Sequence, residues 1–213
     1  MPERDDDAVL LETTVREAGK IARRFFGGEN KNWKKSDGTP VSEADLEVNR
    51  FLKEQLRAAR PDYGWLSEES EDDPARLAAQ KVFVVDPIDG TAAILRGEPH
   101  FTICVAVVND HDSAAAAVYN PLTDEFFAAA KGRGATLNGK PIAVSAREAL
   151  EGCRILVRPT LTAQSIWRSN PWPKMHEEDR CSAAYRLVLV AAGIFDATIS
   201  LTSKCDWDLA AGI

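Results

Sequence analysis

The sequence is poor in residues that bind soft metals. Its 213 residues include only four cysteines and three histidines, and they are scattered so that no Cys-x-x-Cys pair occurs. A structural zinc site needs such ligands at close spacing, so this class of fold is excluded. Widely separated cysteines are typical of reduced thiols, and we expect a cytoplasmic protein.

The sequence also lacks a long apolar run and a surplus of positive charge. No stretch approaches the roughly 18 apolar residues of a membrane span, and the N-terminal Met1–Asp7 is acidic, the reverse of a secretory signal. A net charge of −7 argues against a protein that binds nucleic-acid polymers through their phosphates. We therefore expect neither a membrane nor a nucleic-acid partner. The negative net charge is compatible with small phosphorylated substrates, because bound cations reverse the local charge.

The spacing of apolar residues predicts an α+β arrangement in the first two thirds of the chain. Helical periodicity runs over residues 8–26 and again from Ser42 to near Pro61, with a polar connector over 29–40. Asn138-Gly139 is a strong hairpin signal. We expect a largely antiparallel sheet covered by the two helices, with strands at 63–67, 81–86, 102–108, 114–119 and 125–130.

The character of the sequence changes near residue 148. We expect an N-terminal α+β domain over residues 1–148 and a C-terminal α/β domain over 149–213. The second contains a strand at 154–157, an apolar helix at 182–193 and a strand at 197–201. Trp207–Ile213 resembles the first turns of a helix that is too short to be stable by itself. We therefore expect the C-terminal domain to be incomplete, with Asp208 poorly held if the protein ends at Ile213.

Two aspartates after a predicted buried strand carry the clearest chemical signal. The apolar Val82–Val85 delivers Asp86 to the end of the strand, and Asp89 follows after two residues. Carboxylates that converge in this way repel each other unless a cation lies between them. Oxygen ligands without histidine or cysteine suit Mg²⁺ better than zinc, so the segment predicts a magnesium site.

The next residues predict a seat for an anion. Gly90 permits close approach of the backbone, and Thr91 begins a short helix whose first amides, with those of Gly90 and Ala92, point outward. A phosphate bound there would touch the metal as well. The alternative is an ordinary turn between a strand and a helix.

A different phosphatase motif has to be considered for the same segment. Haloacid-dehalogenase-type phosphatases carry Asp-x-Asp-Gly-Thr, with the first aspartate as nucleophile. Two positions before Asp89 this chain has Pro87, and the acid lies one residue too early at Asp86. No nucleophile stands in the required place, so we reject this motif.

Three further acids are candidates, each with a structural alternative. Glu68 follows a short apolar strand and would complete the metal site, unless it belongs to a solvated acidic loop that continues through residues 71–73. Asp45 fits a capping box with Ser42 and would also pair with Thr91. Asp208 stands at a helix start, where aspartate is commonly only a cap.

Taken in order, these pieces resemble the inositol monophosphatase family. Its members carry an Asp-Pro-Ile/Leu-Asp-Gly-Thr loop, an upstream Glu-Glu after a strand, an earlier Thr-x-x-Asp segment and a late Trp-Asp-x-Ala-Ala-Gly. The matching segments here are 42–45, 68–69, 86–91 and 207–212. The resemblance covers most of the chain and implies a layered αβαβα sandwich.

The resemblance also implies roles for individual residues. Two or three Mg²⁺ ions would be held by Glu68, Asp86, the Ile88 carbonyl, Asp89 and Asp208. Asp208 would also contact the substrate.

The phosphate and the attacking water would be held close by. Gly90, Thr91 and Ala92 would bind the phosphate, and Thr91 and Asp45, with Glu68 beside the metal, would activate the water. Lys35, or its neighbour Lys34, would lie near a third metal or the phosphate. The implied reaction is in-line attack of water without a phosphoenzyme.

Several positions depart from the family pattern and leave the substrate open. The loop continues with Ala92-Ala93-Ile94 where many members have Asn-Phe or a basic residue followed by Phe. Leu201 replaces a glutamate that grips sugar hydroxyls in inositol-cleaving members. Asp206 before Trp207 looks more like the branch that hydrolyses 3'-phosphoadenosine-5'-phosphate.

The leading hypothesis is therefore a phosphomonoesterase acting on a small phosphorylated polyol such as inositol monophosphate. A 3'(2'),5'-bisphosphate nucleotidase is the first alternative, followed by a histidinol-phosphate or fructose-1,6-bisphosphate phosphatase. A non-catalytic binding module is a further alternative, which the complete set of ligand types argues against. The resemblance alone implies a homodimer and sensitivity to lithium.

Overall fold

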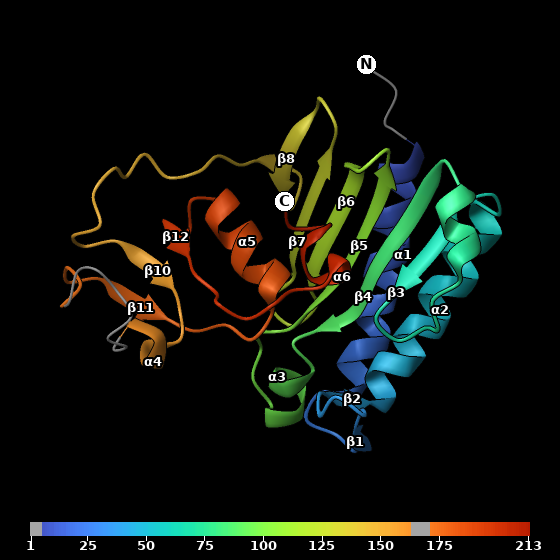
Figure 1. Cartoon of the computed structure of the whole chain (residues 1–213), viewed down its shortest axis with the longest axis horizontal. Coiled ribbons are helices and arrows are strands. Elements are labelled where there is room, and N and C mark those ends of the chain that lie inside the picture. Colours follow the sequence, from blue (N-terminus) through green and yellow to red (C-terminus); the bar gives the residue numbers. More distant parts are fainter. Residues whose placement is uncertain (1–5, 163–170) are drawn as a thin grey trace.

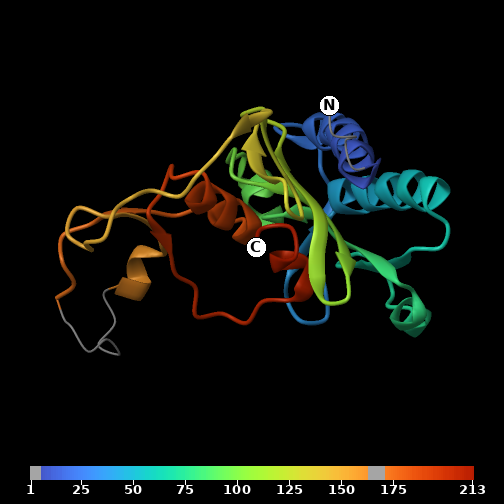
Figure 2. The same cartoon turned by 90° about the horizontal axis from the view of Figure 1, so that it is seen from above.

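The computed structural model describes residues 6–162 and 171–213 and shows helices and sheets in alternating layers (Figures 1 and 2). The helices are α1 (Asp6–Phe25), α2 (Glu43–Ala59), the 3-10 helix η1 (Pro74–Ala78), α3 (Thr91–Arg96), α4 (Pro159–Thr162), α5 (Ala183–Ala191) and α6 (Asp206–Leu209). The strands are β1 (Asn32–Lys34), β2 (Pro40–Ser42), β3 (Gly64–Ser67), β4 (Lys81–Asp89), β5 (Thr102–Asn109), β6 (Asp112–Asn120), β7 (Glu125–Ala130), β8 (Gly134–Leu137), β9 (Lys140–Pro141), β10 (Arg154–Leu156), β11 (His176–Glu178) and β12 (Ala197–Thr198).

The main sheet has the order β3-β4-β5-β6-β7-β8-β9. Only β3 and β4 are parallel, and the other neighbours pair antiparallel, which confirms the expected sheet. The turn between β8 and β9 is the predicted Asn138-Gly139 hairpin, and both residues have positive φ angles of 49° and 76°.

Both faces of this sheet are covered, which explains why its central strands are apolar throughout. On β5, Ile103, Val105 and Val107 pack against α1 and α2, and Cys104 and Ala106 lie in the cluster formed with α5. A strand buried on both faces reads as a continuous apolar run. Gly19 lets α1 approach the sheet, because a Cβ there would lie 2.4 Å from the ring of Tyr119.

A smaller parallel sheet, with the order β11-β10-β12, lies beyond α5, and α4 lies beyond that (Figure 2). The sequence of layers is thus helices, main sheet, α5, small sheet and α4, which confirms the predicted αβαβα arrangement. No helix in the described part of the chain has the length and apolar character needed to cross a membrane.

Some predictions of elements were wrong. Residues 29–40 were predicted only as a polar connector; β1 lies within it and pairs antiparallel with β2. The strand expected at 197–201 is only two residues long, and β11 was not predicted because His176–Glu178 is exposed and carries no apolar pattern. β4 continues past the predicted end at Asp86 to Asp89, with an irregular register in between.

One buried carboxylate ties the start of α1 to the end of α2 and to β4. Asp7 is 3% exposed and accepts hydrogen bonds from Arg60 Nε at 2.9 Å, the Tyr63 hydroxyl at 2.9 Å and Lys81 Nζ at 2.8 Å. Burial by itself raises the pKa of Asp7, but the bonds from Lys81 and Tyr63 outweigh it and hold the pKa below its ordinary value.

We expect Asp7→Asn to lower the free energy of unfolding by about 2–3 kcal/mol, because two cations lose their buried partner. The pKa of Asp7 is lowered in the folded state, so its contribution to stability is complete above the unfolded pKa of about 3.9 and fades as the pH falls below it. Urea unfolding at pH 7 and pH 3 measures this. Asp112→Asn is the control, since the exposed Asp112–Lys131 pair is screened by solvent and should contribute far less to stability. Equal effects of both variants at pH 7 would contradict the assignment.

Candidate active site

Three carboxylates from distant parts of the sequence converge at the end of β4. Oxygens of Asp86, Asp89 and Asp208 lie within 4.8 Å of one another. Asp86 and Asp89 are 1% and 6% exposed, and Asp208, on α6, is half-buried. The structure therefore brings together the three predicted aspartates, and α6 is held against β4 and β5 within the described chain.

The local backbone explains how two aspartates of one strand reach the same place. Asp86 pairs with Cys104 and Asp89 with Thr102, and the register shifts between these pairs. Asp86 Oδ1 also accepts a hydrogen bond from the amide of Ile88 at 3.1 Å. The one extra residue of the bulge turns both carboxylates to one side.

The electrostatic cost of this arrangement is visible in the acids. Burial raises the pKa of Asp86 well above its ordinary value, and the charges of Asp89, Glu68 and Asp208 raise it further. Burial likewise raises the pKa of Asp89 to about 6, although hydrogen bonds from Ser182, Ala184 and Ala183 oppose it. Crowded acids with raised pKa values are typical of a cation site, because a bound cation offsets their repulsion.

Asp89 is held by the start of α5, a contact that the sequence did not reveal. Its Oδ2 accepts bonds from the Ser182 hydroxyl and the Ala184 amide, both at 2.7 Å, and its Oδ1 accepts one from the Ala183 amide at 3.1 Å. The Ser182 hydroxyl also caps α5 through the amide of Tyr185. The serine at the start of an apolar helix was a readable cap signal, but nothing in it indicated Asp89 as the partner.

Asp45 and Thr91 are paired as expected. The Thr91 hydroxyl donates to Asp45 Oδ1 at 2.7 Å and lies 3.2 Å from the carbonyl oxygen of Ile88. The other oxygen of Asp45 accepts bonds from the Ser42 amide at 2.9 Å and the Ser42 hydroxyl at 2.6 Å. The cap and the contact with Thr91 therefore exist together. Burial raises the pKa of Asp45 in spite of these bonds.

The backbone after Asp89 is shaped as predicted. Gly90 has a φ of 100°, and a Cβ there would lie 3.1 Å from the carbonyl oxygen of His100, so only glycine fits. The first bond of α3 is donated by Ala93 to the Gly90 carbonyl at 2.7 Å. The amides of Thr91 and Ala92 precede it and have no partner within the helix.

Glu68 lies beside the three aspartates but outside their cluster. Its amide donates to the Val85 carbonyl at 3.2 Å, which places it next to β4, and its carboxylate accepts a bond from Lys35 at 2.8 Å. Lys35 also lies 2.6 Å from Glu69. Residues 71–73 are exposed, as a solvated acidic loop would be, whereas the side chain of Glu69 is only 6% exposed. The exposed Lys34 on β1 makes no such contact in the described structure.

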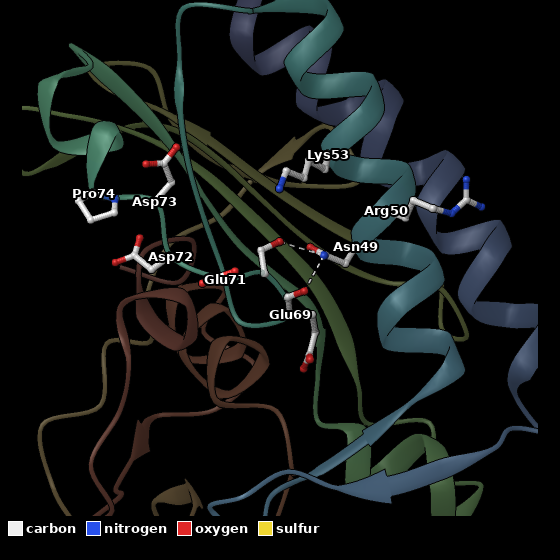
Figure 3. Close-up of a pocket in the computed structure, with 9 residues that line it drawn as sticks. Asn49, Arg50, Lys53, Glu69, Glu71, Asp72, Asp73 and Pro74 are labelled. Carbon is white, nitrogen blue, oxygen red and sulfur yellow. Dashed lines mark hydrogen bonds between the residues drawn. The ribbon is translucent and has the colours of Figure 1, made fainter.

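A cavity of about 660 Å³ adjoins Glu69 and lies apart from this site (Figure 3). It is bordered by Asn49 and Lys53 of α2 and by the loop that contains Asp72 and Asp73. The Asn49 amide bonds the Glu69 carbonyl at 2.9 Å and the Ser70 hydroxyl at 3.1 Å. None of the three clustered aspartates borders the cavity, so it is not the candidate site.

Comparison with known proteins identifies the family. The profile of the "Inositol monophosphatase family" matches residues 4–213. An inositol-1-monophosphatase of Rhizobium meliloti is 37% identical over 96% of this chain and 79% of its own length. The 3'(2'),5'-bisphosphate nucleotidase CysQ of Aggregatibacter actinomycetemcomitans is 30% identical over 92% and 76%.

A solved structure agrees with the sequence matches. The extragenic suppressor protein suhB of Bartonella henselae superposes with a TM-score of 0.86 and 32% identity, covering 98% of this chain and 83% of that one. The family is one of phosphoric monoester hydrolases that depend on metals, and the acidic cluster of Asp86, Asp89 and Asp208 suits such a reaction. On this evidence the chain belongs to the inositol monophosphatase family.

Proposed function

We propose that this chain is an Mg²⁺-dependent phosphomonoesterase that hydrolyses a small phosphorylated substrate by direct attack of water. The observation that carries the proposal is the convergence of Asp86, Asp89 and Asp208 beside the Asp45–Thr91 pair. The assignment of two domains, the cytoplasmic location and the homodimer stay predictions.

The donors at the site fit a hard cation. Asp86, Asp89 and Asp208 offer carboxylate oxygens, and the carbonyl of Ile88 and the carboxylate of Glu68 lie close by. Mg²⁺ prefers such ligands. When bound there, the ions would lower the pKa of a water molecule and neutralise charge on the phosphoryl group. Glu68 would join the set by leaving Lys35, which now holds its carboxylate.

Thr91 and Asp45 can remove the proton of an attacking water. The Thr91 hydroxyl donates a hydrogen bond to Asp45. The lone pairs of the Thr91 oxygen are therefore free to accept a hydrogen bond from water. Ser42 holds the other oxygen of Asp45 and fixes the direction of transfer. A carboxylate whose pKa is raised by burial is a stronger base than an exposed one.

The start of α3 would bind the phosphate. The amides of Gly90, Thr91 and Ala92 lie at the N-terminal end of this helix, close to Asp89. Backbone amides in fixed positions stabilise negative charge as it develops on the transferring group. Asp208, only half-buried, is the member of the acidic cluster best placed to contact the substrate as well.

A small phosphorylated polyol such as inositol monophosphate is the first candidate substrate, and a nucleoside 3',5'-bisphosphate is the second. Leu201 favours the second, because this exposed residue has no side-chain group that could bond a sugar hydroxyl. The similarity to both an inositol-1-monophosphatase and a bisphosphate nucleotidase supports either.

Mg²⁺ should raise the midpoint of thermal unfolding at pH 7.5, and the rise should shrink as the pH falls through about 6, the pKa of Asp89. The pKa of Asp89 is higher in the folded state than in the unfolded state, so the metal-free fold loses stability as the pH rises from about 4 to 6. A bound cation offsets this loss, because it stabilises the ionised carboxylate. Saturating Mg²⁺ should add about 5–10 °C relative to EDTA.

Two neighbouring aspartates on α6 provide the control for this experiment. Asp208→Asn should abolish the increase with Mg²⁺, while Asp206→Asn, at an exposed position, should keep it. An increase that is independent of pH, or that survives in Asp208→Asn, would show that Mg²⁺ acts elsewhere.

Asp45→Asn should lower kcat for phosphate release by about 10²–10⁴-fold, because the proton of the water loses its acceptor. Stabilisation by Mg²⁺ should remain, since Asp45 lies outside the cluster of three acids. Glu47→Gln on the same helix is the control and should keep kcat. Loss of metal stabilisation together with activity would assign Asp45 to metal binding.

The substrate class can be separated by a screen for inorganic phosphate. With Mg²⁺ present, at least one of inositol 1-phosphate, adenosine 3',5'-bisphosphate, histidinol phosphate and fructose 1,6-bisphosphate should be hydrolysed, and activity should stop in EDTA and in Asp89→Asn. Mg²⁺ binding without hydrolysis of any phosphomonoester would favour a non-catalytic module.

A further inference from the structure

The strands of the small sheet end at one edge, and from this edge the chain runs on to α5 and α6, which carry residues of the candidate site (Figure 1). β10, β11 and β12 are parallel, so their carboxyl ends lie together, where ligands commonly bind in such sheets. From the end of β11 the chain reaches Ser182, which donates to Asp89, within four residues. From the end of β12 it leads to Asp208.

A buried arginine stands at this edge with only neutral partners. Arg186, one turn into α5, is 8% exposed. Its Nε donates to the Thr198 hydroxyl at 2.9 Å, and its Nη2 donates to the carbonyls of Leu156 at 2.7 Å and Ile199 at 2.5 Å. No carboxylate of the described residues shares a hydrogen bond with it.

A buried cation without a bonded counter-ion is costly, and an anionic ligand would offset the cost. Burial lowers the pKa of Arg186; the charge of Asp179 opposes this, and the charge of Arg158 lowers the pKa further. The Nη1 group of Arg186 makes no hydrogen bond to any described residue and keeps its two N–H donors.

A second arginine adds uncompensated charge at the same edge. Arg158 follows the end of β10 after one residue, and its side chain is exposed. It forms no hydrogen bond or ion pair with the side chains that the structure describes. Arg180, after β11, differs because it is paired with Glu178 at 2.7 Å. Free positive charge at this edge therefore belongs to Arg158 and Arg186.

We propose that Arg158 and Arg186 bind a second phosphate group of the substrate. The inference rests on the proposed function and narrows its substrate class to small bisphosphates, in which one phosphate is cleaved beside Asp89 and the other lies at the edge of the small sheet. Arg186 lies about 6 Å along the axis of α5 from Ser182, whose hydroxyl donates to Asp89. Arginine is well suited to this role because its planar fork matches phosphate oxygens.

Matched substrate pairs test the proposal. With Mg²⁺, we compare kcat/KM for adenosine 3',5'-bisphosphate with adenosine 3'-monophosphate, and for fructose 1,6-bisphosphate with fructose 1-phosphate. In at least one pair the bisphosphate should be favoured by about tenfold or more, as expected for a charge-assisted hydrogen bond to the second phosphate.

Arg158→Gln should lower that ratio by about three- to tenfold through a higher KM for the bisphosphate. The effect should be smaller than for a buried arginine, because solvent screens the charge of this exposed side chain. Arg133→Gln, an exposed arginine in the turn between β7 and β8, is the matched control and should keep the ratio. Arg186 is left unchanged because it also anchors the ends of β10 and β12.

The outcomes separate this inference from the proposed function. Equal efficiency within both pairs, or a ratio that is the same in Arg158→Gln and the parent protein, would overturn the second phosphate site and leave the phosphatase assignment intact. Absence of phosphate release from all four compounds and from inositol 1-phosphate would overturn both.

Discussion

The repulsion among Asp86, Asp89 and Asp208 is the constraint on which the rest of the site depends. Burial removes the water that would screen these charges, and their oxygens lie within 4.8 Å of one another. The fold tolerates this crowding because β4 is braced on both sides and because amides of α5 bond to Asp89. Three crowded carboxylates would destabilise an ordinary core, but here they attract a divalent cation strongly.

Helix α5 joins the two halves of the site. Its first residues hold Asp89 of the main sheet, and one turn later Arg186 holds the ends of β10 and β12. A small displacement of this helix would therefore move a metal ligand and the small sheet together. Figure 1 shows this link, since α5 lies between the main sheet and the small sheet.

Much of the site could be predicted because its chemistry is local. The segment from Asp86 to Thr91 carries two acids, a required glycine and a helix start in six residues, and Asp45 fits both a cap and a partner of Thr91. The family resemblance then brought Asp208 from the far end of the chain. The predicted layers were confirmed for the same reason, since helical and strand periodicities are properties of short segments.

The features that could not be predicted depend on contacts between distant segments. Nothing in Ser182 shows that its hydroxyl donates to Asp89, 93 residues away. Glu69 is buried beside Lys35, which precedes α2 in the sequence, whereas Glu69 follows it. β11 carries no apolar pattern and exists because β10 lies beside it. The neutral hydrogen-bond partners of Arg186 could not be predicted either, because only tertiary packing brings them to the arginine.

The most direct test of the account is an anomalous-scattering experiment on crystals of this protein soaked with Mn²⁺, which occupies the same oxygen sites as Mg²⁺. We expect at least one strong peak at about 2 Å from carboxylate oxygens of Asp86, Asp89 and Asp208 together. Peaks that are absent there, or present only at other acidic side chains, would contradict the claim that these three acids form the metal centre.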